Sequence, residues 1–153
     1  SALVAVNAVG EIVDTVSNTV VAGIRANDVG HYESAVDVAL GNTAKAPVAG
    51  TNTTLGLIAT NANLSKVQLK KVAEMAHDGM ARAIRPIHTQ FDGDTVFAVS
   101  MPRSEIEPTA DADAQLNSIG IAGAKALELA IVDAVRSAKS VGDVIACCDW
   151  HND

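Results

Sequence analysis

Hydrophobic and polar residues follow one another along the chain in a pattern that predicts four strands. Residues 2–7 and 11–16 are apolar or alternating, and Gly10 lies between them. This predicts two tightly joined strands or one strand with a bulge. Residues 55–61 are almost wholly apolar, which is typical of a strand buried on both faces. Residues 95–101 are rich in β-branched and apolar residues and complete the set.

Two longer segments have the signals of helices. Ser65 is a candidate N-cap and Gln68 completes a capping box, so a helix is expected from there to about Ile84, before Pro86. A second long helix is expected from about Ala114 to Ala138, after a polar break. Small residues should let this helix lie close to its neighbours: Gly120, Gly123, Ala124, Ala126 and Ala130.

The order of these elements indicates the fold class. Strands are followed by a helix, a strand and a helix, which predicts sheets covered by helices in an α+β or layered α/β arrangement. Residues 26–52 are punctuated by Asn, Asp, Gly and Pro, so a long irregular loop is expected there, of a kind that is usually functional or mobile. The 153 residues suffice for one core and not for two, so residues 1–153 are expected to form a single domain.

Composition and charge narrow the classes of function. The formal charge is -7 and no basic stripe is present, which argues against a nucleic-acid-binding protein. No signal-peptide core or membrane-length apolar stretch occurs, so no membrane association and a cytoplasmic location are expected. The histidines do not share ligand spacing, and neither a metal nor a cofactor is expected. The chain begins with Ser1 and an apolar run, from which we expect the C-terminal part of a longer product.

The candidate chemistry lies at the start of the strand over residues 55–61. Thr53 follows Asn52 directly, after the loop-rich segment. A Thr hydroxyl can attack the carbonyl that precedes it, and cleavage then leaves an N-terminal Thr whose α-amine, with a pKa of about 8, serves as the local base. The simpler interpretation is that Thr53 and Thr54 are β-branched residues that begin a strand.

Four further residues are candidates for the same chemistry. Asp92 and Asp94 flank a glycine, which fits a tight turn or two carboxylates that orient the Thr53 amine and assist proton transfer. Asn7 interrupts an apolar strand, so it is an edge residue, a buried amide satisfied by the backbone, or an oxyanion donor. His88 lies close enough in sequence to Asp92 to allow a Thr/His/Asp triad as a second arrangement.

These elements together resemble a known family. Residues 2–10, Asn52-Thr53-Thr54 and the stretch from His88 to Phe97 are similar to the three motifs of the DmpA-type aminopeptidases (the L-aminopeptidase/D-esterase family). These are N-terminal-nucleophile hydrolases, and their Thr-nucleophile branch includes the endo-type nylon oligomer (6-aminohexanoate) hydrolase. The likeness runs over essentially the whole chain, with the three motifs in the same order.

The resemblance implies a fold, a site and a processing step. The fold would be an αββα layered sandwich with the nucleophile strand central, assembled into homo-oligomers of processed αβ units. Self-cleavage between Asn52 and Thr53 would make residues 1–52 the end of the α-subunit and residues 53–153 the β-subunit. Thr53 would be the nucleophile, Asn7 the oxyanion donor, and Asp92 and Asp94 the acidic groups.

Three functions stay open on this basis. The first is an amide hydrolase of the aminopeptidase or amidase type that acts on a small peptide or amide through an acyl-enzyme on Thr53. The second is an acyl transferase similar to the ornithine acetyltransferases. The third is a non-catalytic, truncated homologue that serves as an oligomerisation subunit, in which the bond before Thr53 would stay intact.

Overall fold

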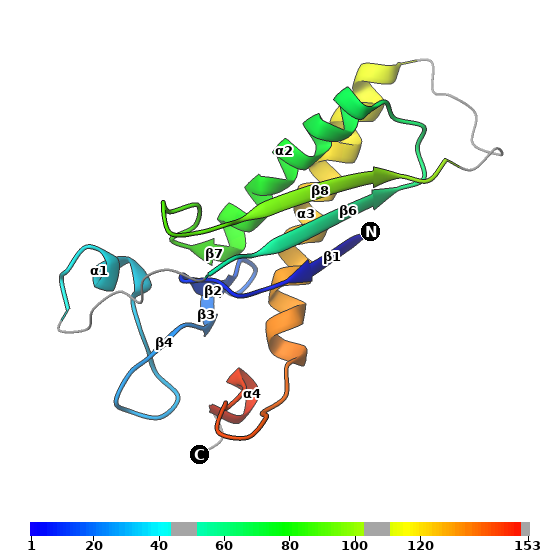
Figure 1. The fold of residues 1–153 in the computed structure, drawn as a ribbon. Helices are drawn as coiled ribbons and strands as arrows, with labels where there is room; N and C mark the ends of the chain where they lie inside the picture. Colours follow the sequence, from blue (N-terminus) through cyan, green and yellow to red (C-terminus); the bar gives the residue numbers. More distant parts are fainter. Residues whose placement is uncertain (44–51, 103–110, 151–153) are drawn as a thin grey trace.

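A three-stranded sheet with the nucleophile candidate's strand in the middle forms the centre of the fold (Figure 1). The structure, a computed structural model, describes residues 1–43, 52–102 and 111–150. The sheet has the order β1-β6-β8 and contains β1 (Ala2–Ala5), β6 (Leu55–Thr60) and β8 (Thr95–Ser100). β1 runs antiparallel to β6, and β8 runs parallel to it. The parallel pair requires a long crossover, which the helix between the two strands provides.

Two long helices, α2 (Lys66–Ala83) and α3 (Ala112–Ser137), lie side by side against one face of this sheet (Figure 1). The predicted capping box is formed: Ser65 accepts a hydrogen bond from the Gln68 main-chain N–H, and the Gln68 side chain accepts one from Ser65. The first predicted helix is therefore confirmed to within two residues at each end, and the second begins two residues earlier than expected.

Small residues set the distance between the two helices. A Cβ atom at Gly79 of α2 would lie 2.1 Å from the carbonyl oxygen of Ala124 on α3. A Cβ atom at Gly120 would lie 2.2 Å from the sulfur of Met75. The helices therefore approach each other through glycine on both sides, as the small residues of the second helix predicted.

The remaining elements lie around the lower end of this layer (Figure 1). A second sheet has the order β3-β2-β7 and consists of short strands: β2 (Glu11–Asp14), β3 (Thr19–Ala22) and β7 (Ile84–Arg85). Two further strands pair with each other, and two short helices complete the described chain: β4 (Ile24–Arg25), β5 (Tyr32–Glu33), α1 (Ala35–Ala39) and α4 (Cys147–Trp150).

The two faces of the central sheet differ sharply in burial. The face toward the helices carries Ile58 and Val96, which are buried with the side chains of α2 and α3. The opposite face carries Leu3, Leu55 and Phe97, which are 70%, 45% and 58% exposed. The prediction that residues 55–61 are buried on both faces is therefore wrong for this structure, because the helices pack on one face only.

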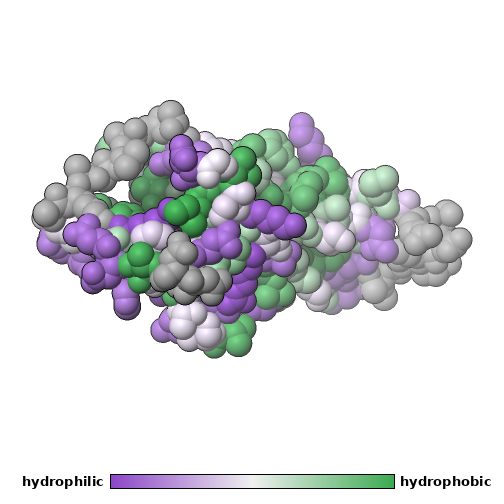
Figure 2. All heavy atoms as spheres, turned by 90° about the horizontal axis from the view of Figure 1, so that it is seen from below, coloured by the Kyte–Doolittle hydropathy of each residue, from purple (hydrophilic) through white to green (hydrophobic). Residues whose placement is uncertain are grey.

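Apolar side chains reach the surface elsewhere as well. Figure 2 shows hydrophobic residues interrupting the hydrophilic surface in the view from below. Exposed large apolar side chains include Val29, Leu40, Val141 and Val144. Across the described ranges, no helix combines the length and the apolar character that crossing a bilayer requires.

The α+β class is confirmed, and the local predictions fail mainly at short elements. β3 and β7 were not foreseen from the sequence. Residues 26–52 are not wholly irregular, since they contain β5 and α1, where Ser34 caps the helix by accepting from the Asp37 N–H. The rest of that predicted loop, residues 44–51, lies outside the described residues. Cys147 and Cys148 are both free thiols.

Candidate active site

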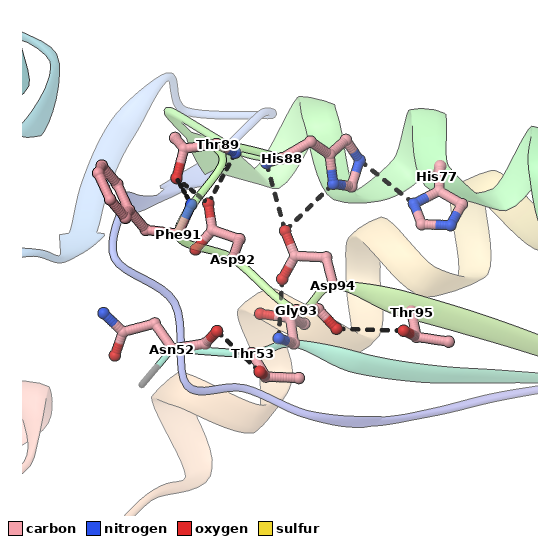
Figure 3. Close-up of polar contacts among 11 residues, drawn as sticks. Asn52, Thr53, His77, His88, Thr89, Phe91, Asp92, Gly93, Asp94 and Thr95 are labelled. Atoms are coloured by element: carbon pink, nitrogen blue, oxygen red, sulfur yellow. Dashed lines mark hydrogen bonds and ion pairs between the residues drawn. The ribbon is translucent and has the colours of Figure 1, made fainter. Parts of the chain in front are cut away.

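The Asn52–Thr53 peptide enters β6 between two other segments of the chain (Figure 3). On one side, the Thr53 N–H donates to the main-chain carbonyl of Asn7 at 2.9 Å. On the other side, the Gly93 N–H donates to the carbonyl oxygen of Asn52 at 3.1 Å. Asn52 also forms a parallel bridge with Asp92. The structure therefore brings the three separated motifs of the sequence together at one peptide bond.

The Thr53 hydroxyl lies against the carbonyl group that it would attack. Its Oγ1–H donates to the carbonyl oxygen of Asn52 at 2.7 Å. A Cβ atom on Gly93 would lie only 2.6 Å from this Oγ1, so glycine allows this close approach without a shift of the hydroxyl or of the turn. One carbonyl oxygen thus accepts from both the Thr53 hydroxyl and the Gly93 N–H.

This arrangement identifies a group that the sequence reasoning missed. The Gly93 N–H already points at the oxygen on which negative charge would develop if Thr53 attacked the Asn52 carbonyl carbon. A main-chain N–H in that place has the geometry of an oxyanion-hole donor. The glycine between Asp92 and Asp94 is the available signal, but the sequence pattern alone predicts only a turn residue there.

Asn7 lies beside Thr53, and its main chain makes the contact described above. Its carbonyl oxygen fixes the nitrogen of the peptide bond that would be cut. The sequence assigned Asn7 a role through its side-chain amide as an oxyanion donor, which stays a prediction.

Asp94 anchors Thr54, the residue that follows the nucleophile candidate. Its side chain is only 2% exposed. Oδ1 accepts from the main-chain N–H of Thr54 at 2.8 Å. Oδ2 accepts from the main-chain N–H of His88 at 3.3 Å, and it lies 3.1 Å from Nδ1 of the His88 ring (Figure 3). This buried carboxylate ties the start of β6 to the segment before β8.

Asp92 has a different environment, although the sequence pattern indicates the same candidate roles for Asp92 and Asp94. Its Oδ2 accepts from both the N–H and the hydroxyl of Thr89, at 2.8 and 2.7 Å. These contacts lie within its own turn and shape the loop that carries Gly93. The two carboxylates therefore have different structural roles: Asp92 orders the turn, and Asp94 holds the start of β6.

His88 contacts Asp94 through one ring nitrogen and His77 through the other. Its Nε2 lies 3.2 Å from Nδ1 of His77, and the two rings meet edge to face. Burial, followed by the neighbouring His88, lowers the pKa of His77 below its ordinary value, against the opposing charges of Asp94 and Asp78. The Thr/His/Asp triad considered from the sequence is therefore not formed, because the second nitrogen of His88 faces His77 rather than Thr53.

A cavity of about 630 Å³ lies on the Asn52 side of the bond. Asn7 and Asn52 line it together with apolar residues from the first strands and α1, among them Val6, Ile12, Ile24 and Val38. The space beside the acyl side of the candidate bond is thus mainly aliphatic.

Comparison with known proteins agrees with these motifs. Residues 1–145 match the model of Peptidase family S58. An uncharacterized aminopeptidase of Mycobacterium leprae is 40% identical over 111 residues, covering 68% of this chain and 31% of that protein. A 6-aminohexanoate-oligomer endohydrolase of Paenarthrobacter ureafaciens is 36% identical over 115 residues, which cover 71% of this chain and 31% of that protein. The chain thus spans about three tenths of the length of these relatives. The resemblance to the DmpA-type enzymes is confirmed, and the chain belongs to Peptidase family S58.

Proposed function

We propose that this chain is part of an amide hydrolase that cleaves itself between Asn52 and Thr53 and then uses Thr53 as an N-terminal nucleophile. One observation carries the proposal. The Thr53 hydroxyl lies 2.7 Å from the carbonyl oxygen of Asn52, and the Gly93 N–H donates to that same oxygen. These contacts around one bond support Thr53 as the nucleophile and the Gly93 N–H as the donor for the developing charge.

The self-cleavage follows from these contacts. Oγ1 of Thr53 attacks the carbonyl carbon of Asn52, and the Gly93 N–H stabilises the negative charge on the oxygen. The C–N bond then breaks, the nitrogen takes up the hydroxyl's proton, and an ester joins Asn52 to Oγ1. Water hydrolyses this ester, which leaves a carboxylate on Asn52 and a free amine and hydroxyl on Thr53.

Turnover reuses the same groups on an external amide. The Thr53 amine, with a pKa of about 8 before any influence of the site, accepts the hydroxyl's proton as Oγ1 attacks the substrate carbonyl. The Asn7 carbonyl, which accepts from this nitrogen in the intact chain, orients the amine. The Asn7 side chain acts as a further oxyanion donor, Asp94 holds the strand behind Thr53, and Asp92 keeps the Gly93 turn in shape. The amine leaving group departs with a proton, and water releases the acid.

The finer architecture belongs to the same proposal. The exposed apolar face that carries Leu3, Leu55 and Phe97 supports the packing of a second sheet there, as in an αββα sandwich. The single domain 1–153 then becomes the end of an α-subunit (1–52) and a β-subunit (53–153), and processed units assemble into homo-oligomers in the cytoplasm. The relatives named aminopeptidase and 6-aminohexanoate-oligomer endohydrolase support a small peptide or amide as substrate.

Intact-mass spectrometry under denaturing conditions tests this proposal. The purified protein is expected to give two fragments that divide between Asn52 and Thr53. Thr53→Ala should give one uncut mass and no hydrolysis of amide substrates, because it removes the attacking oxygen. Thr53→Ser keeps a hydroxyl and should still divide at the same bond. Cleavage at this bond in Thr53→Ala, or an uncut wild type, would contradict the proposal.

A second experiment distinguishes an amide hydrolase from an acyl transferase. Processed protein is given a small amide together with a free amine, and the acid and the new amide are both quantified. We expect the acid to be the main product. Transfer that outruns hydrolysis would assign the chain to the acyl-transferase alternative instead.

A further inference from the structure

A continuous line of polar contacts runs from α2 to the strand of the nucleophile (Figure 3). It begins at His77, passes through the His88 ring at 3.2 Å and reaches Oδ2 of Asp94 at 3.1 Å. The other oxygen of Asp94 accepts from the Thr54 N–H at 2.8 Å. His77 and His88 belong to neither the proposed nucleophile nor its oxyanion donors, so this line needs a separate explanation.

The backbone at His88 is arranged for this contact. Its φ is +57°, in the left-handed region that non-glycine residues adopt infrequently. The same residue places both its N–H and its ring Nδ1 on Oδ2 of Asp94. Because this infrequent backbone conformation brings two donors to one buried oxygen, it indicates a local constraint that serves the contact with Asp94.

The hydrogen-bonding roles along the line are consistent. The Asp94 carboxylate accepts only, so Nδ1 of His88 carries a proton. In neutral His88 the Nε2 lone pair then accepts from Nδ1–H of His77. In cationic His88, Nε2–H donates to a neutral His77, and burial favours the neutral form of His77. The contacts are therefore satisfied in both charge states of His88.

We propose that His88 and His77 are positioning residues for the self-cleavage at Asn52–Thr53. His88 holds Asp94 on the Thr54 N–H, which fixes the start of β6 and keeps Thr53 against the Asn52 carbonyl. His77 fixes the His88 ring from α2. The charged and titratable groups that act on His77 are His88 and Asp94, from the segment before β8, and Asp78 on α2 itself. This inference rests on the proposed function.

Two substitutions at His88 separate its ring donor from its backbone. Asn tolerates positive φ and places its side-chain N–H where Nδ1 of the ring lies, so His88→Asn keeps the donor to Asp94. Gly also tolerates positive φ but has no donor. The fraction cut at Asn52–Thr53 is followed over time by intact mass. His88→Gly should slow cleavage by roughly tenfold or more, because a hydrogen bond to a charged group is lost. His88→Asn should recover most of that loss, and equal rates for the two variants would overturn the proposal.

A second readout does not depend on cleavage. In the full chain carrying Thr53→Ala, hydrogen exchange of the Thr54 amide reports directly on its bond to Asp94. Exchange should be faster with His88→Gly than with His88→Asn. If the wild type stays uncut, the proposed function fails, and this comparison still decides whether His88 holds Asp94. Equal exchange in the two variants would mean that it does not.

The same logic tests His77 on α2. His77→Ala removes the partner of the His88 ring, and His77→Asn restores an N–H at the position of Nδ1. Cleavage is expected to slow about threefold with Ala and to recover with Asn, a smaller effect than at His88 because His77 acts through one more contact. A His77→Ala protein that cleaves at the wild-type rate, with unchanged Thr54 exchange, would remove His77 from the proposal.

Discussion

Two buried carboxylates, Glu128 and Asp94, show how similar burial can serve different ends. Glu128 on α3 is 3% exposed and Asp94 is 2% exposed. The partners of Glu128 are the half-exposed cations Lys125, at 2.6 Å, and Arg82, at 3.8 Å, with the Thr15 hydroxyl also donating to it. Asp94 instead has two main-chain N–H groups and a histidine. Glu128 thus joins secondary-structure elements through charged side chains, whereas Asp94 holds the start of β6 through main-chain N–H groups and an imidazole ring.

The partners of Glu128 also change its pKa. Burial by itself would raise its pKa, but the hydrogen bonds from Lys125 and Thr15, together with the charges of Lys125 and Arg82, lower the pKa below its ordinary value. A lowered folded-state pKa means that the native protein binds fewer protons than the unfolded chain in this range. Glu128 therefore adds stability above its unfolded pKa, and this contribution is lost as the pH falls through the folded pKa.

Among the substitutions that test this comparison, Asp94→Asn is expected to have the largest effect on cleavage between Asn52 and Thr53. The amide would present an N–H toward the His88 donors or the Thr54 N–H, so at least one contact at the start of β6 must break. We expect cleavage between Asn52 and Thr53 to slow on the order of a hundredfold, as measured by the time course of the intact mass. Glu128→Gln is the matched control, because Glu128 is about as buried as Asp94 and its partners Thr15, Arg82 and Lys125 lie outside the three motifs of the site. Equal cleavage rates in the two variants would remove the distinction between the carboxylates.

Gly93→Ala should have the next largest effect. The new Cβ would lie within 2.6 Å of Oγ1 of Thr53, so the hydroxyl must rotate or the turn must shift. Cleavage is expected to slow by roughly tenfold or more, since small displacements of reacting groups are costly. Gly123→Ala is a suitable control, because its Cβ would meet Ile58 at an ordinary 3.4 Å. A Gly93→Ala protein that processes like the control would contradict the assigned close approach.

Glu128→Gln should change stability and leave processing alone. The charge-assisted bonds of Glu128 are lost, but its cationic partners stay partly solvated, so the expected loss is about 1 kcal/mol of unfolding free energy. Urea denaturation at pH 7 and pH 4 measures it. The difference from wild type should shrink at the lower pH, where Glu128 itself is closer to being protonated. A difference that grows toward pH 4 would show that the sign of the pKa shift is wrong.

The sequence predicted well the features that depend on local patterns. The α2 capping box, the β6 and β8 strands and the α+β class all follow from short-range signals and are confirmed. It did not predict β3 or β7, which are too short to carry a clear period.

The candidate site was predicted only in part, for a related reason. Residue type indicated Asp92 and Asp94, but which acid faces the turn and which faces β6 depends on tertiary contacts. The Gly93 N–H acts through the direction of the main chain, and the His77–His88 contact depends on how the chain turns back onto α2, so no sequence motif predicts either of them. The exposed face of β6 escaped prediction because an apolar strand has the same sequence whether or not a second layer covers it.

The antiparallel pairing of β1 with β6 has a consequence for the proposed processing. β1 precedes the bond at Asn52–Thr53 and β6 follows it, yet the two strands are hydrogen-bonded neighbours from Ala2↔Ile58 to Ala5↔Leu55. Breaking the peptide bond would therefore turn one chain into two whose sheet stays shared. Unfolding would change from a unimolecular to a dissociative reaction, and the midpoint temperature would come to depend on protein concentration. Hydrolysis of a single peptide bond before Thr53 would thus alter the molecularity of the fold while leaving its shape in place.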